Sequence, residues 1–356
     1  MTGKTIFLSP VTRHSLLITS IHLSPVTCRF FIYPVIIAVL FSAMLLYIKV
    51  ADKFNIIDKP NERSSHNYIT VRGGGIVWWL AGVICSLFYL PESIYFLTGI
   101  TLISGVGFWD DVSSLPNKIR IIIHFLALTV LFYGSGIYRI LSWPMIVFAY
   151  VFVVGILNAY NFMDGINGIT GLYSLAVLIA LQYVNYTIVR FTPPDFINYA
   201  ALASGVFLFF NYRKRAECFA GDVGSVAVAF WIVALLLQLI LKTRSVIWIL
   251  FLTVYGADSV CTILHRLYLR QNIFKAHRMH FYQVLTNERG LSHLKVSAGY
   301  ALVQFIICMI IIILYRWSQT AAGVAGIGML VVCGLIYLLK FKIGTRGTRG
   351  CESSPQ

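Results

Sequence analysis

Long apolar runs separated by short polar segments dominate the chain from about residue 30 onward. The runs show no polar face at helical spacing, and runs of this kind predict helices that are surrounded by lipid. Several are shorter than the roughly 20 residues that an upright crossing needs, and we expect helical loop segments at the membrane edge to lengthen them. The pattern predicts an all-α integral membrane protein, a polytopic bundle of about eleven transmembrane helices, at residues 30–50, 76–90, 94–107, 119–133, 140–157, 169–188, 197–210, 223–241, 246–264, 296–315 and 321–339.

The two ends of the chain fall outside this pattern. Residues 1–29 lack the apolar centre of a signal peptide, and the pentamer Leu-Ser-Pro-Val-Thr occurs in them twice, at residues 8–12 and 23–27. We interpret residues 1–29 as an N-terminal extension to which the sequence assigns no role. Residues 30–340 are the predicted transmembrane domain, and residues 341–356 are a C-terminal tail.

Composition supports the membrane interpretation. Apolar and aromatic residues make up 58% of the chain and charged residues only 12%, against about a quarter charged in soluble domains. The net charge of +15 would suggest nucleic acid in a soluble protein. Basic loops on the cytoplasmic side of a membrane explain it better, so we expect no nucleic-acid partner. Seven cysteines without a C-x-x-C pair give no support for a zinc site or a disulfide framework.

The distribution of Lys and Arg predicts which loops face the cytoplasm. With eleven spans the loops alternate between two sides. The side that holds the loops at 51–75, 108–118, 158–168, 211–222 and 265–295 and the end of the chain carries 20 of the 28 Lys and Arg residues, Lys49 and Arg120 at its edges included. This excess predicts that the set is cytoplasmic, with the N-terminus outside and the C-terminus inside.

Unusual polar residues are concentrated in the same set of loops. Asp58, Asp110, Asp111, Asp164 and Asp222 all lie there, and they are five of the thirteen acidic residues of the chain. Asp110 and Asp111 are adjacent at the edge of a span, where two carboxylates repel each other unless a cation lies beside them. A solvated helix end is the structural alternative, but carboxylates at membrane depth are costly and usually functional.

The segment 158–168 combines amides, a carboxylate and glycines. Asn158 and Asn161 are three residues apart, as are Asp164 and Asn167, and on helical geometry this spacing puts polar oxygens on one face. Such oxygens suit Mg²⁺, which binds through one or two side chains together with substrate phosphates. An Asn/Gly-rich turn is the alternative.

Three further segments carry candidate chemistry. Asp222 begins a long apolar run, either as an acid favoured at a helix N-terminus or as a metal ligand. The basic and glycine-rich stretch 58–75, with Arg63 and Arg72, suits phosphate, although an ordinary loop is the alternative. The loop 277–283 begins with His277, Arg278 and a second histidine, His280, and we expect an anion clamp there, together with Arg266, Arg270 and Lys275.

Two ionisable residues within apolar runs are expected to be structural. His124 is interpreted as an interior residue whose hydrogen bonds are satisfied. Asp258 is expected to pair with a base such as Arg266 or to pack inward.

These segments, in this order, resemble the polyprenyl-phosphate N-acetylhexosamine-1-phosphate transferases. The resemblance covers nearly all of residues 30–340 and rests on five motifs, at residues 59–75, 110–111, 158–168, 221–222 and 277–280. The family implies a multi-helix bundle with a cytoplasmic active site and a divalent cation, Mg²⁺ or alternatively Mn²⁺. Val71 departs from the pattern, since related sequences tend to have proline before Arg-Gly-Gly.

The resemblance also implies roles for single residues. Asn161 and Asp222 look like the metal ligands, and Asp110, Asp111 and Asp164 look like the catalytic acids. The implied substrate-binding residues are Lys118, Asn167, His277, Arg278, His280, Arg63 and Arg72. The His-Arg-x-His string followed by Tyr-Gln looks closest to the bacterial enzymes that begin O-antigen or related glycans.

The implied reaction takes place at the bacterial inner membrane. An oxygen of undecaprenyl phosphate attacks the β-phosphorus of a UDP-N-acetylhexosamine, UMP leaves, and a lipid diphosphate sugar forms. Direct attack and a covalent aspartyl intermediate both stay open, as do the sugar, the glycan pathway and a homodimer. A secondary transporter is the main alternative, but transporters place polar sites near the bilayer midplane. A proton-translocating subunit is a weaker alternative because Lys and Glu are almost absent from the spans.

Overall fold

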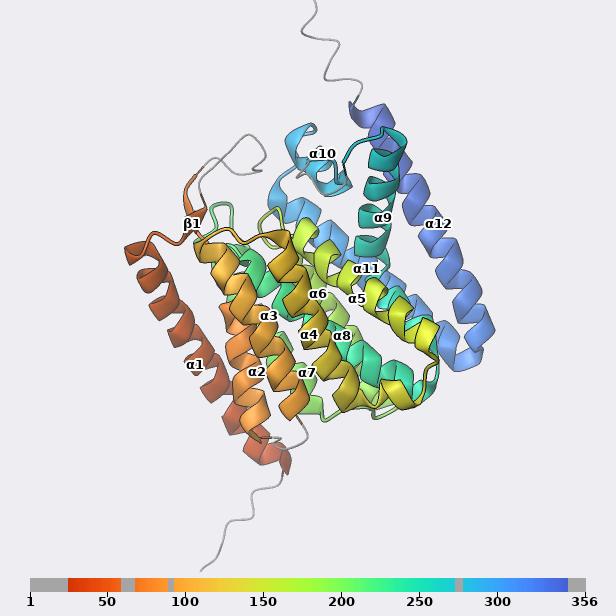
Figure 1. Ribbon diagram of the computed structural model, residues 1–356, viewed down its shortest axis with the longest axis horizontal. Coiled ribbons are helices and arrows are strands. Elements are labelled where there is room, and N and C mark those ends of the chain that lie inside the picture. Colours follow the sequence, from red (N-terminus) through yellow and green to blue (C-terminus); the bar gives the residue numbers. More distant parts are fainter. Residues whose placement is uncertain (1–24, 59–67, 89–92, 273–277, 345–356) are drawn as a thin grey trace, which may run out of the picture.

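The computed structural model describes residues 25–58, 68–88, 93–272 and 278–344, and most of them are helical (Figure 1). Two short strands, β1 (Ile57–Asp58) and β2 (Thr70–Val71), pair in antiparallel register. The helices are α1 (Pro25–Lys53), α2 (Ile76–Phe88), α3 (Ile94–Val112), α4 (Asn117–Ser135), α5 (Trp143–Met163), α6 (Ile169–Thr187), α7 (Pro194–Asn211), α8 (Gly221–Thr243), α9 (Thr253–Tyr268), α10 (Phe281–Asn287), α11 (His293–Trp317) and α12 (Gln319–Gly344), with 3₁₀ turns η1 (Ile137–Arg139) and η2 (Val246–Leu252).

The apolar runs of the sequence correspond to these helices. Each of the eleven runs overlaps a helix, and the run at 246–264 is divided between η2 and α9. Eight segments of the described chain are long and apolar enough to cross a membrane, whereas α2 has only 13 residues. An all-helical integral membrane protein is therefore confirmed. The number of crossings and the side that each loop faces stay predictions.

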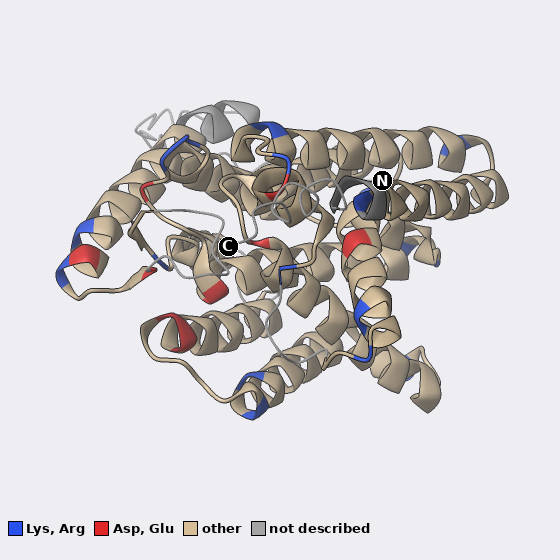
Figure 2. Ribbon diagram, turned by 90° about the horizontal axis from the view of Figure 1, so that it is seen from above, with Lys and Arg blue, Asp and Glu red and all other residues tan. Residues whose placement is uncertain are grey.

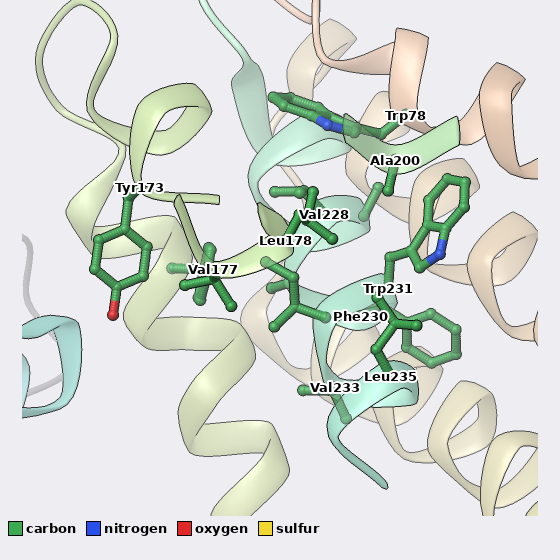
Figure 3. Close-up of a cluster of buried hydrophobic side chains, with 14 of the residues drawn as sticks. Trp78, Tyr173, Val177, Leu178, Ala200, Val228, Phe230, Trp231, Val233 and Leu235 are labelled. Atoms are coloured by element: carbon green, nitrogen blue, oxygen red, sulfur yellow. The ribbon is translucent and has the colours of Figure 1, made fainter. Parts of the chain in front are cut away.

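Helix α8 is the centre of the bundle. In its most apolar stretch 83% of the residues are buried, against 17% in α5 and 17% in α12. A helix that is apolar on every face belongs in the interior, and α8 packs against α2, α3 and α5. Phe230 and Trp231 of α8 lie among buried side chains of α2, α6 and α7, including Trp78, Leu178 and Ala200 (Figure 3). Helix α8 is consequently held by several helices along its length, its N-terminus included.

Glycines let the neighbouring helices approach α8 closely at that N-terminus. A Cβ atom on Gly75 would lie 2.2 Å from the Cα atom of Gly224, and one on Gly107 would lie 2.7 Å from the Cα atom of Val223. These contacts are between backbones, which cannot move aside as a flexible side chain can. Small residues of this kind allow close helix packing in membranes.

A buried amide compensates for a broken helix on the other side of α8. The span before α10 begins as the 3₁₀ turn η2 and changes to an α-helix at Thr253. Gln304 of α11 accepts a hydrogen bond from the backbone N–H of Val254 at 2.9 Å and donates one to the carbonyl of Leu250 at 3.3 Å. Backbone groups without partners are costly in lipid, so Gln304 makes the change of helix type tolerable.

The segments that carry the sequence motifs meet at one end of the bundle. The β1–β2 pair, the start of α8 and α10 all lie toward the top of Figure 1. Val71 of β2 also pairs with Cys218, so the glycine-rich stretch and the segment before α8 are joined. Figure 2 looks onto this end and shows that Lys, Arg, Asp and Glu are sparse along the ribbon.

The packing at α8 predicts different outcomes for two glycines of α3. Gly107→Ala should lower the free energy of unfolding by roughly 1–3 kcal/mol, the usual cost of overpacking, because its Cβ would meet the backbone of Val223. Gly105→Ala is the matched control, since a Cβ there meets nothing within 4 Å. Thermal unfolding in detergent measures both, and equal midpoints for the two variants would contradict the described crossing.

Candidate active site

Asp222, in the first turn of α8, is the residue on which the site converges. It is only 6% exposed. Its Oδ1 atom accepts a hydrogen bond from Arg72 Nη2 at 2.9 Å. Its Oδ2 atom pairs with Arg120 Nη2 at 2.6 Å and accepts a hydrogen bond from Asn161 Nδ2 at 2.9 Å. A buried carboxylate without partners would be strongly destabilising, and three elements outside α8 supply the partners.

Asp111 at the end of α3 caps the beginning of α8. Its two carboxylate oxygens accept hydrogen bonds from the backbone N–H groups of Asp222 and Val223, at 2.9 and 3.0 Å. Arg72 Nε lies 2.7 Å from Asp111 Oδ1. A negative charge at the first N–H groups of a helix is stabilising, so Asp111 fixes the position and direction of the turn that carries Asp222.

The neighbouring Asp110 points to different partners. Its Oδ1 atom accepts a hydrogen bond from the backbone N–H of Leu115 at 2.7 Å, and its Oδ2 atom lies 3.2 Å from Arg120 Nη1. Two arginines therefore supply the expected positive charge beside the acid pair, Arg72 for Asp111 and Arg120 for Asp110. Arg120, from the first turn of α4, joins Asp110 to Asp222.

Backbone pairing positions Arg72. The N–H of Arg72 donates to the carbonyl of Ile56 at 3.0 Å, and its carbonyl accepts a hydrogen bond from the hydroxyl of Tyr47 at 2.8 Å. Gly73 follows with a φ of +82°, a conformation that glycine adopts readily. The guanidinium is thereby directed at both Asp111 and Asp222. Burial lowers the pKa of Arg72, but these two carboxylates outweigh that effect and raise the pKa above its ordinary value, so Arg72 stays charged.

The polar segment 158–168 is only partly helical. Asn158 and Asn161 lie on α5, as the spacing predicts, but α5 ends at Met163 and Asp164 begins a turn. The expectation that Asp164 and Asn167 share a helical face is wrong, because these residues belong to the connection between α5 and α6. The connection ends at Gly168, whose backbone is in the left-handed conformation, and α6 begins at the next residue. Asn158 donates to the carbonyl of Val154 in its own helix, and it is not among the residues that line the cavity described below.

Asp164 and Asn167 nevertheless reach the site from this turn. Desolvation raises the pKa of the Asp164 carboxyl to about 7, although the hydroxyl of Thr170 donates to its Oδ1 atom at 2.6 Å and lowers the pKa. Asn167 is 1% exposed, and its Nδ2 atom donates to the carbonyl of Arg213 at 2.8 Å. Asn167 thus ties the turn to the segment between α7 and α8.

A cavity of about 210 Å³ lies beside Asp222. Its lining is mainly polar and comes from five parts of the chain, namely the β1–β2 region, the turn after α5, the end of α7, the start of α8 and the segment around α10. The lining residues are Asp58, Arg72, Asn161, Asp164, Gly165, Ile166, Asn167, Asn211, Phe219, Gly221, Asp222, Gln283 and His293. Five residues with predicted roles, Arg72, Asn161, Asp164, Asn167 and Asp222, therefore face one space.

The second histidine of the 277–283 loop has a different environment from the one expected. His280 is 3% exposed, and its Nδ1 atom lies 3.2 Å from Asp258 Oδ1. Asp258 also accepts hydrogen bonds from the backbone N–H of Phe281 at 3.0 Å and from the hydroxyl of Tyr300 at 2.8 Å. Asp258 packs inward, but its basic partner is His280 and not Arg266. The aspartate fastens the start of α10 to α9 and α11.

The expected anion clamp lies partly outside the described residues, so it stays a prediction. Arg266 is 3% exposed and donates to the backbone carbonyl of Asn272, so it faces inward, whereas Arg278 is exposed. Lys118 is also exposed, and it lies outside the cavity lining. His277, Lys275 and Arg63 lie outside the described residues.

His124, two turns from the start of α4, differs from its expectation. It is buried, but its Nδ1 atom has no hydrogen-bond partner among the described residues. The prediction that the hydrogen bonds of His124 are satisfied in the interior is therefore wrong for its Nδ1 atom.

The donor set around Asp222 fits a divalent cation that takes oxygen ligands. Mg²⁺ is usually bound through one or two side chains plus substrate phosphates, and Asp222 and Asn161 are two adjacent side chains with oxygen atoms. The Asn161 amide lies 2.9 Å from Asp222 Oδ2, about the separation of neighbouring ligands in octahedral coordination at 2.0–2.1 Å. Rotation of that amide would present its oxygen instead of its nitrogen.

Comparison with known proteins shows which transferases the chain is similar to. The profile of glycosyl transferase family 4 matches residues 93–240, the part that runs from α3 through α8 and contains Asp110, Asp111, Asn161 and Asp222. A probable undecaprenyl-phosphate N-acetylglucosaminyl 1-phosphate transferase of Bacillus subtilis is 28% identical over 293 residues, 75% of this chain and 79% of that protein. These similarities support the polyprenyl-phosphate N-acetylhexosamine-1-phosphate transferase family for this chain. The undecaprenyl-phosphate alpha-N-acetylglucosaminyl 1-phosphate transferases of Salmonella typhi and Escherichia coli K12 are 27% and 26% identical, each covering 82% of the chain and 81% of the relative.

The sequence motifs do not predict several residues of this transferase site. Arg120 counts in the sequence only toward the charge of a loop, yet it bridges two of the three central acids. Its place at the edge of an apolar run is a signal, since cations near membrane depth usually have a partner. Asn211, Gln283 and His293 line the cavity, but nothing in their local sequence distinguishes them.

The hydrogen bonds of the buried Asp258 carboxylate predict a large loss of stability when its side chain is removed. Asp258→Ala leaves the His280 side chain, a backbone N–H and the Tyr300 hydroxyl without their acceptor, and should lower the free energy of unfolding by about 3 kcal/mol or more. Ser259→Ala is the matched neighbour, because the buried Ser259 hydroxyl has no hydrogen-bond partner in the described structure. Chemical unfolding in detergent compares them, and a cost no larger than that of the serine variant would refute the arrangement.

The raised pKa of Asp164 predicts a pH-dependent effect for Thr170→Val. Between the unfolded value of about 3.9 and the folded value of about 7, the folded protein keeps a proton that the unfolded chain releases. Its contribution to stability therefore falls as the pH rises through that window. Removal of the hydroxyl that donates to the carboxylate raises the folded pKa further, so the variant should lose more thermal stability at pH 8 than at pH 5.5. An equal loss at both pH values would contradict this assignment.

Proposed function

We propose that this protein transfers N-acetylhexosamine 1-phosphate from a UDP-sugar to undecaprenyl phosphate, with release of UMP, in a Mg²⁺-dependent reaction. The observation that carries the proposal is the convergence of Asp110, Asp111, Asn161 and Asp222 with two arginines, from separate helices, beside one polar cavity. The relatives named above support the same overall reaction. Each of them is a transferase that acts on undecaprenyl phosphate by its name.

The reaction brings a phosphate anion to a diphosphate, so the protein must reduce repulsion between like charges. Mg²⁺ held by Asp222 and Asn161 would neutralise the diphosphate and polarise it toward attack. Arg72 lines the same cavity and offers a planar set of donors for phosphate oxygens. Asp164 and Asn167 border the space that the nucleotide sugar would take.

The two adjacent acids would have different tasks. Both oxygens of Asp111 accept hydrogen bonds from the backbone of α8, which assigns it the positioning of Asp222. Asp110 instead lies beside Arg120, at the end of α3 and outside the cavity lining. We assign to Asp110 the orientation of the attacking lipid phosphate, or the removal of its proton. Lys118, exposed in the first turn of the same helix as Arg120, would contact that phosphate.

The proposed location is the cytoplasmic side of the bacterial inner membrane. The excess of Lys and Arg in the loops that carry the site supports this side. The His-Arg-x-His and Tyr-Gln strings favour a role at the start of O-antigen or a related surface glycan. Tyr282 of that string donates to the carbonyl of Phe162 at 3.0 Å, which fastens α10 to the end of α5, next to the cavity.

Release of UMP tests the proposal. Purified full-length protein in detergent, supplied with undecaprenyl phosphate, Mg²⁺ and each of a panel of UDP-N-acetylhexosamines, should release UMP with at least one sugar. Asp222→Ala should abolish release at every Mg²⁺ concentration, whereas Asp52→Ala, an exposed acid of α1, should leave it unchanged. Wild-type turnover in the Asp222 variant would remove this residue from the reaction, and absence of UMP with the whole panel would refute the proposed donor class.

A further inference from the structure

The Oδ2 atom of Asp222 has no room for a further ligand in the described arrangement. A carboxylate oxygen offers about two lone-pair directions. Arg120 Nη2 at 2.6 Å and Asn161 Nδ2 at 2.9 Å use both of them. A cation that binds Asp222 on the side of Asn161 therefore has to displace one of these two donors.

The two donors differ in what they can do when a cation arrives. The amide of Asn161 has an oxygen as well as a nitrogen, so a rotation converts it from a donor to a ligand. The guanidinium of Arg120 has donors alone and always carries its charge. Arg120 is consequently the group that must leave, since it can neither coordinate a cation nor lose its own charge.

Arg72, the other arginine on Asp222, is held more firmly. Its N–H and carbonyl are both hydrogen bonded, to Ile56 and Tyr47, and its Nε atom pairs with Asp111, whose side chain is fully buried. Departure of Arg72 would leave that carboxylate without a cation. It also binds the other oxygen of Asp222, so it does not compete for the position beside Asn161.

Arg120 has both the reach and the freedom to move. Its side chain is 20% exposed, less than the 33% of Arg72, so its freedom comes from its partners: it approaches Asp222 from the first turn of α4, outside the cavity lining, and has no link to Asp111 in the described structure. Its remaining partner, Asp110, keeps the backbone N–H of Leu115 as a donor when the arginine leaves. Departure of Arg120 therefore leaves neither acid without a partner, because Asp222 keeps Arg72.

We infer that Arg120 is an exchangeable cation, which neutralises Asp110 and Asp222 before substrates bind and transfers to a phosphate oxygen of a substrate when a divalent ion takes its place on Asp222. The inference rests on the proposed function, because that function supplies the divalent ion and the phosphate. Before substrates bind, Arg120 neutralises the two acids. After the divalent ion has bound, Arg120 neutralises a phosphate oxygen of the substrate instead. The exchange keeps a positive charge in the site at every stage and makes metal binding and phosphate binding depend on each other.

Mg²⁺ binding tests the exchange without measuring turnover. The thermal unfolding midpoint of the full-length protein in detergent is followed in EDTA and then over a series of Mg²⁺ concentrations. In EDTA, Arg120→Gln should have a lower midpoint than the wild type, because Asp110 loses its cation and Asp222 keeps only Arg72. Its half-maximal response to Mg²⁺ should occur at a concentration lower by roughly tenfold or more, since a competing positive charge a few ångströms away is gone. Arg120→Lys keeps the charge and should fall between the two.

Lys118→Gln is the matched control. It removes the same charge two residues away, from an exposed side chain that makes no ion pair in the described structure. Its Mg²⁺ response should stay within about twofold of the wild type, because screening by water weakens exposed charges. A shift as large as that of Arg120→Gln would show a general effect of local charge and overturn the exchange.

Binding of the two phosphate substrates completes the test. Affinity for a UDP-N-acetylhexosamine and for undecaprenyl phosphate is measured separately at saturating Mg²⁺. Arg120→Gln should weaken the substrate that receives the guanidinium, so a loss in the first arm identifies the donor diphosphate and a loss in the second identifies the lipid phosphate. A loss in neither arm would overturn the transfer.

The Mg²⁺ series also separates the failure of the inference from that of the proposed function. A wild type whose midpoint does not respond to Mg²⁺ would refute the metal assignment and the exchange together. A wild type that responds, with Arg120→Gln responding at the same or a higher concentration, would refute the exchange alone.

Discussion

The buried charge of Asp222 governs the structure of this end of the molecule. A carboxylate that is 6% exposed at the start of the most buried helix is tolerable only if other groups neutralise and hydrogen bond it. Arg72, Arg120 and Asn161 do so from the segment after β2, from α4 and from α5. Because the partners come from separate elements, the charge also fixes how those elements are placed around α8.

Close backbone packing is the second half of this arrangement. Asp111 can cap α8 because α3 crosses it at Gly107, and Arg72 can reach both acids because α2 begins in contact with α8 at Gly75. Larger side chains at these crossings would move the helices apart by more than the length of a hydrogen bond allows. Polar groups at the membrane edge thus depend on glycines that themselves carry no chemistry.

The sequence predicts the helices and most of the converging motifs, because both leave local signals. Apolar runs mark α8 and its neighbours, and scarce acids mark Asp110, Asp111, Asp164 and Asp222. Local sequence fails where a partner comes from another element. The spacing of Asp164 and Asn167 suggests a helix, but glycine and the end of α5 produce a turn. His280 looks like a solvent-facing anion ligand, yet Asp258 and Tyr300 enclose it from two other helices. Arg120 has a role only because Asp222, about a hundred residues later, lies beside it.

The contact between Gly75 and Gly224 restricts how the sequence of this protein can diverge. A Cβ at either position would lie less than 2.5 Å from the backbone of the other helix, so a side chain at one position cannot be accommodated by shrinking the other, which is already glycine. As long as α2 and α8 keep their crossing, a larger residue at one position cannot be compensated by a smaller residue at the other, so both positions have to stay glycine. Packing restricts α1, α5 and α12 much less, because few of their residues are buried.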